Sequence, residues 1–121
     1  MGRAEMGQAE GMTEPSADDG DARRAFDEAM RNIYTRAHRE AGYNATLYLR
    51  MLSELGPLET ARRLLASSTP SAGFTGLWEK GRLDLTVEAL VLRTEFRQFF
   101  TDDELETARE RLERLDYRME R

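Results

Sequence analysis

The chain contains no cysteine among its 121 residues, which excludes disulfide bridges, thiolate nucleophiles and zinc sites built on thiolates. It has one histidine, His38, which a Ser-His-Asp triad would have to use, and no nucleophile-elbow pattern accompanies it. His38 lies between Arg36 and Arg39 near the end of an expected helix, where basic residues are ordinary. The glycines between residues 73 and 81 do not have the spacing of a phosphate-binding loop. We therefore expect a protein that is not an enzyme and holds no cofactor or metal.

Long apolar runs are missing too. No stretch approaches the roughly 18 residues of a membrane-spanning helix. The N-terminus lacks the basic start and apolar middle of a signal peptide. These absences predict a cytoplasmic protein with no membrane partner.

Charge is distributed unevenly along the chain. Residues 1–28 hold three Arg against eight Asp and Glu, a net charge of -5, whereas the rest is balanced at 15 basic and 15 acidic residues. A balanced body argues against nucleic-acid binding through a broad basic surface. Residues 1–20 contain no aromatic residue and cannot bury enough apolar surface to offset their ordering entropy. We predict a disordered acidic tail over residues 1–20 and a single helical domain over residues 21–121.

The first predicted helix has apolar residues at three-and-four spacing. It begins at Asp19 or Asp21, where acidic side chains suit the positive end of the helix dipole, and Gly42 is the expected stop. Its apolar stripe comprises Ala22, Ala25, Phe26, Ala29, Met30, Ile33, Tyr34 and Ala37.

Two further helices form a predicted hairpin over residues 44–66. Asn44 is a suitable N-cap for the second helix, which Gly56 ends. Pro57 then opens the third helix, because proline is favoured at the first helical position. The apolar residues of the pair are Leu47, Tyr48, Met51, Leu52, Leu55, Leu58, Ala61, Leu64 and Leu65.

The segment GFTGLWEKGRLDLTVEALV, residues 73–91, is compositionally the most unusual. It holds the only Trp, the only Lys and three glycines. Leu77 and Trp78 suit a single helical turn that Gly81 ends, and Trp78 is expected in the core or at a partner surface. The best candidates for a functional surface are the residues around this turn, namely Thr75, Trp78, Glu79, Arg82 and Asp84.

Three carboxylates near this turn, those of Glu79, Asp84 and Glu88, leave an enzymatic alternative open. A metal or acid–base role would require them to converge in one pocket. The plainer interpretation is that Glu79 pairs with Arg82 and that Asp84 or Thr86 caps the next helix.

The segment that follows is ambiguous between helix and strand. LTVEALVLR contains two Val and a Thr, which suit a strand, but no other segment alternates convincingly and a lone strand would lack a partner. We favour a buried helix, followed by an apolar turn with Phe96, Phe99 and Phe100.

The last helix has the clearest start signal. Thr101 and Glu104 form a predicted capping box, in which each side chain bonds the other residue's backbone N–H. Leu105, Ala108, Leu112 and Leu115 face inward. The fold class predicted from these patterns is an all-α, compact bundle of about five helices. The bulky side chains expected to fill its core are Tyr34, Tyr48, Phe74, Trp78, Phe96 and Phe99.

A nucleic-acid interpretation also remains open. Two helices joined by a tight turn at residues 56–57 are similar to a helix-turn-helix, and Arg50, Arg62 and Arg63 would be its contacts. Such hairpins are generic, and a neutral body makes few phosphate contacts.

From about Phe26 to Tyr117 the chain resembles a family of small bacterial all-α proteins of uncharacterised function. The pieces that carry the resemblance are IYTRAHREAGYNATLYLRML, ETARRLLAS, GFTGLWEKGRLDLTVEALVL and FTDDELETARERL. The resemblance implies a fold and a bacterial source but no activity. Together with the composition, it leads us to expect a regulatory or interaction module that binds a protein partner or associates with itself.

Overall fold

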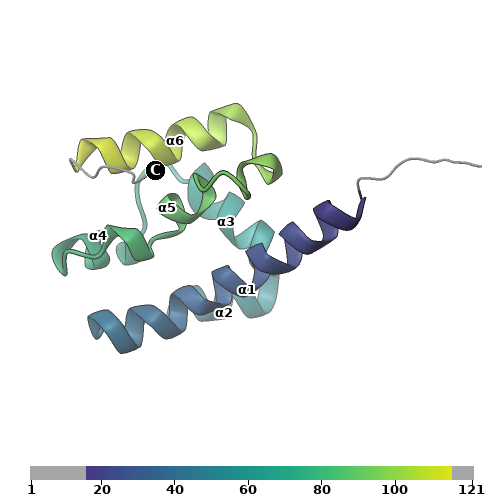
Figure 1. The fold of residues 1–121 in the computed structure, drawn as a ribbon. Helices are drawn as coiled ribbons and strands as arrows, with labels where there is room; N and C mark the ends of the chain where they lie inside the picture. The colour runs from purple at the N-terminus through teal and green to yellow at the C-terminus, as the bar shows by residue number, and fades with distance from the viewer. Residues whose placement is uncertain (1–15, 116–121) are drawn as a thin grey trace, which may run out of the picture.

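The computed structural model describes residues 16–115, with side chains from Gly20 onward. Over these residues the chain is helical and contains no strand, which confirms the predicted all-α bundle (Figure 1). The elements are α1 (Ser16–Ala41), α2 (Thr46–Leu55), α3 (Pro57–Ala66), α4 (Ala72–Glu79), the 3-10 turn η2 (Leu83–Leu85), α5 (Val87–Val91), the 3-10 turn η3 (Arg97–Phe99) and α6 (Asp102–Arg114).

Helix α5 lies at the centre of the bundle. It packs against α1, α3 and α6, and η2 connects it to α4. In Figure 1, α1 and α6 lie on opposite sides of the molecule with α5 and α3 between them, and α2 lies behind α1. The short central helix is therefore the element on which the longer helices meet.

Helix α1 begins earlier than the sequence pattern predicts. The predicted tail reaches residue 20, whereas the structure places residues 16–20 in α1. Residues 1–15, the rest of the predicted tail, lie outside the described part of the chain. The predicted stop is confirmed, because Gly42 has a φ of 66°, in the left-handed region that favours glycine.

In the hairpin of α2 and α3, the turn between the two helices forms as predicted, but the N-cap of α2 differs from the prediction. Gly56 ends α2 with a φ of 84°, and Pro57 is the first residue of α3, as predicted. Asn44 is not the N-cap of α2, because Ala45 occupies that position and makes no side-chain cap bond. The Asn44 Oδ1 instead accepts a hydrogen bond from the Tyr34 hydroxyl at 3.4 Å, which ties the loop to α1.

Two threonine caps define the C-terminal half. The Thr86 Oγ1 accepts from the Ala89 N–H at 3.2 Å, so the strand alternative for this segment is wrong and so is Asp84 as the cap. The predicted capping box is confirmed: the Glu104 N–H donates to Thr101 Oγ1 at 3.1 Å, and the Thr101 N–H donates to Glu104 at 2.8 Å.

The main core gathers around Phe26 of α1. Its ring lies 5.4 Å from that of Phe96 and 5.7 Å from that of Phe100, measured between centroids, with edge-to-face geometry. Trp78 is not in this core, contrary to one of the two predicted placements, and is 45% exposed. The inward face of α4 is occupied by Phe74 and Leu77, which leaves Trp78 on its outer side.

A second, smaller core attaches residues 73–85 to the end of α1. Ala37, Leu77 and Leu85 form its buried centre, and Tyr43 packs against it. No helix within residues 16–115 is long and apolar enough to cross a membrane.

Candidate functional site

The predicted functional surface divides into two parts in the structure. Thr75, Trp78 and Glu79 lie exposed on α4, whereas Arg82 and Asp84 lie past its end. The predicted pair of Glu79 with Arg82 does not form, because Arg82 turns to Asp84 and to Glu40 of α1.

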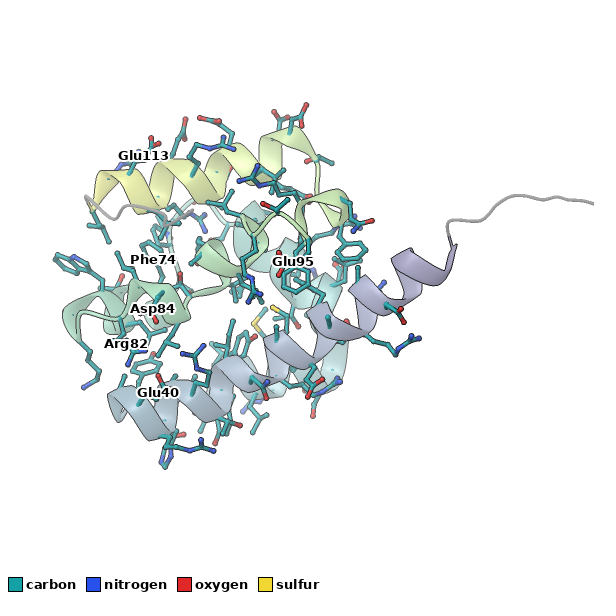
Figure 2. All side chains as sticks on the ribbon, in the orientation of Figure 1. Glu40, Phe74, Arg82, Asp84, Glu95 and Glu113 are labelled. Atoms are coloured by element: carbon teal, nitrogen blue, oxygen red, sulfur yellow. The ribbon has the colours of Figure 1, made fainter. Side chains whose placement is uncertain are left out.

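Arg82 is the centre of an ion-pair network on the surface. Its Nε and Nη2 donate to the two carboxylate oxygens of Asp84, each at 3.0 Å, and its Nη2 also donates to Glu40 at 2.8 Å. Arg36 donates to Glu40 from the other side at 2.9 Å. Figure 2 shows Glu40, Arg82 and Asp84 close together, between the end of α1 and the segment that follows α4. Hydrogen bonds from Arg36 and Arg82 lower the pKa of the Glu40 carboxyl to about 2. The network fastens residues 82–84 to α1.

We expect Glu40→Gln to change how stability depends on pH. The folded-state pKa of about 2 lies below the ordinary value of 4.5, so the contribution of Glu40 is present above pH 4.5 and is lost as the pH falls toward 2. Urea denaturation across this range should show a steeper loss in the wild type than in Glu40→Gln. Glu79→Gln, on an exposed residue with no ion pair among residues 16–115, should follow the wild type. Parallel curves for wild type and Glu40→Gln would contradict the role given to this carboxylate.

An apolar pocket opens between α2 and α4. It has a volume of about 180 Å³ and is bounded by residues of α1, α2, α3, α4, η2 and the start of α5. Ile33, Leu77 and Leu85 line its inner part, and Leu47, at its edge, is 65% exposed. An exposed leucine beside an apolar cavity is typical of a surface that a binding partner covers. The residues between the helices that complete the lining are Tyr43, Asn44, Ala45, Ser71 and Thr86.

Glu88 lines the same pocket as a buried carboxylate that is only 2% exposed. Arg111 of α6 donates to its Oε2 at 2.9 Å and to the Leu64 carbonyl at 3.0 Å, and it also donates to the Ser67 carbonyl. Burial raises the pKa of the Glu88 carboxyl, and the hydrogen bond from Arg111 opposes that shift. Arg111 therefore joins α6 and the end of α3 to the pocket wall.

Tyr48 supports the pocket from α2. Its hydroxyl donates to the Met30 carbonyl of α1 at 2.6 Å, and burial raises the pKa of the phenol above its ordinary value. The bond holds α2 against α1 while the ring lines the cavity.

The three carboxylates of the enzymatic alternative do not converge. Glu79 is exposed on α4, Asp84 is held by Arg82, and Glu88 is buried against Arg111. Within residues 16–115 no cluster of three His, Asp or Glu side chains has the arrangement to hold a metal ion.

Two of the three arginines of the nucleic-acid alternative have partners within the protein. Arg62 donates to the Phe99 carbonyl at 2.9 Å and lies 3.8 Å from Glu104, and Arg63 pairs with Glu59 at 3.1 Å. Arg50 is exposed on α2.

No protein-family model matches this chain, and no curated protein or solved structure matches it either. The resemblance to a family of small bacterial proteins therefore stays a prediction.

Proposed function

We propose that this protein is a protein-binding module whose apolar pocket receives an apolar side chain from a partner protein. The observation that carries the proposal is the pocket itself, open to the surface and edged by Leu47 with 65% of its area exposed. Exposed apolar surface beside a preformed cavity is typical of sites where a partner inserts an anchor residue.

The size of the pocket favours a side chain over a free small molecule. Pockets for drug-sized ligands range from about 300 to 1,000 Å³, and this one holds about 180 Å³. A cavity of about 150 Å³ suffices for a ring the size of benzene. The occupant is therefore a single leucine-, isoleucine- or phenylalanine-sized group presented by a larger partner.

The proposed role is binding without catalysis, in the cytoplasm of a bacterium. The cellular setting comes from the sequence alone. Binding at the pocket depends on neither the source organism nor the family resemblance.

The experiment is a peptide-display selection against the immobilised protein. We expect enriched sequences to share one large apolar residue, and individual peptides to bind with micromolar affinity. Leu47→Asp should weaken these peptides at least about tenfold, because a charge beside an apolar contact must be desolvated without a partner. Leu49→Asp is the matched control, since Leu49 is exposed on the same helix but does not line this pocket.

Two results would contradict the proposal. One is a selection without an apolar consensus, and the other is an equal loss of binding for Leu47→Asp and Leu49→Asp. Tight, salt-sensitive binding of duplex DNA by the same protein would favour the nucleic-acid alternative instead.

A further inference from the structure

A second surface, separate from the pocket, lies between α1 and α2. It consists of two adjoining depressions of about 320 and 540 Å³ that share Tyr34 and Thr35. We call them together the α1–α2 groove. Their lining residues are Arg31, Tyr34, Thr35, His38 and Arg39 of α1, Leu49, Leu52 and Ser53 of α2, and Pro57 of α3.

The groove is basic although the body of the chain is electrically neutral. Arg31, His38 and Arg39 line it, and none of its lining residues is acidic. Arg36 on the same helix is held by Glu40, but neither Arg31 nor Arg39 has an ion-pair partner among residues 16–115. An acidic ligand would therefore meet uncompensated positive charge here.

The groove also has an apolar component. Leu49 is 42% exposed at its edge, and the Tyr34 ring and Pro57 lie in the lining. A nucleic acid would use little of this apolar area, and two arginines give few phosphate contacts. An acidic polypeptide with interspersed apolar side chains fits both properties.

The chain itself contains such a polypeptide. Residues 1–15 hold Glu5, Glu10 and Glu14 against one arginine, a net charge of -2, together with Met6 and Met12. They lie outside the described part of the chain and join it at Ser16, the first residue of α1. We propose that residues 1–15 bind in the α1–α2 groove of their own chain, with Glu10 facing Arg31 and Glu5 facing His38 and Arg39.

The length of the segment is sufficient. With a rise of about 1.5 Å per residue, α1 carries the chain roughly 22 Å from Ser16 to Arg31 and roughly 35 Å to Arg39. Fifteen extended residues span up to about 50 Å. A tethered segment also has an effective concentration in the millimolar range, so even weak contacts suffice to hold it. A separate acidic partner would have to compete with this segment.

Paramagnetic relaxation measured by NMR on the full chain tests the proposal. Because the chain has no cysteine, Met6→Cys creates a unique site for a nitroxide label. Amides in the first turns of α1 will lose signal through the tether alone, so the informative residues are Leu49 and Ser53 of α2. We expect their signals to be lost when the label is oxidised and to return when it is reduced.

Variants that remove charge or alter the groove distinguish specific binding of residues 1–15 from random encounters of this segment with the surface. Replacing Glu5 and Glu10 by Gln, or adding about 0.5 M salt, should restore the Leu49 and Ser53 signals. Leu49→Asp should restore the Ser53 signal, whereas Leu47→Asp, outside the groove, should not. Signal loss that stays confined to the start of α1, or that is equal over the whole surface, would overturn the proposal.

A mixed sample identifies which chain supplies the segment. Protein that carries the nitroxide but no ¹⁵N is mixed with ¹⁵N-enriched protein that carries no nitroxide. We expect no signal loss in the observed copy. Loss at Leu49 and Ser53 would show that the segment comes from a second copy and would overturn binding within one chain.

Discussion

Arg111→Ala is expected to lower the free energy of unfolding by about 3–5 kcal/mol, because it leaves Glu88 as a buried carboxylate without its partner. The same change removes the donor from the carbonyls of Leu64 and Ser67. A domain of this size has only about 5–15 kcal/mol in total, so a large part of its stability would be lost. Urea denaturation at neutral pH measures the effect.

A surface arginine on the same helix is the control. Arg109 pairs with Glu106, both side chains being largely exposed, and Arg109→Ala should cost no more than about 1 kcal/mol. Replacing both Glu88 and Arg111 by Met should recover part of the loss, because no unpaired charge is then buried. Equal, small losses for Arg111→Ala and Arg109→Ala would contradict the importance given to the buried pair.

Gly73→Leu is expected to weaken peptide binding at least about thirtyfold without loss of stability. Gly73 lines the pocket, and a Cβ there would meet Tyr43 and Ser71 at 3.7 Å or more, which is ordinary contact distance. The added side chain would occupy the space of the partner's anchor, a contact that is typically worth about 2 kcal/mol or more. Leucine also favours a helix over glycine, by up to about 1 kcal/mol.

The measurements are peptide affinity and melting temperature on the same samples. Thr75→Leu, on the exposed side of α4 and outside the pocket, should bind as the wild type does. Gly76→Ala is expected to lower the melting temperature, because its Cβ would lie 2.5 Å from the Tyr43 ring. Wild-type affinity for Gly73→Leu would show that peptides bind elsewhere.

Local signals in the sequence predicted most helix ends. The left-handed glycines at 42, 56 and 81, the proline at the start of α3 and the capping box of α6 all act within four residues of the chain. The failures depend on distant contacts. Asn44 has the chemistry of an N-cap, but its side chain is bonded to the Tyr34 hydroxyl ten residues away.

The candidate site was harder to predict, because it depends on how helices pack. Arg111 lies three residues after Ala108, so its spacing places it at the inward face of α6, but its charge gave no reason to expect burial. Its partner Glu88 lies 23 residues earlier in the chain. Trp78 suggested a core residue by its size, but the phase of α4 turns Phe74 and Leu77 inward instead. The pocket has no sequence signature, since residues from six separate elements form its walls.

Intermolecular NOEs between a selected peptide and the methyl groups of the protein test the central claim most directly. We expect contacts from the apolar anchor of the peptide to Ile33, Leu47 and Leu85, which line the pocket. Contacts only to residues outside the pocket, such as those flanking Trp78, would show that the protein binds its partners through a different surface.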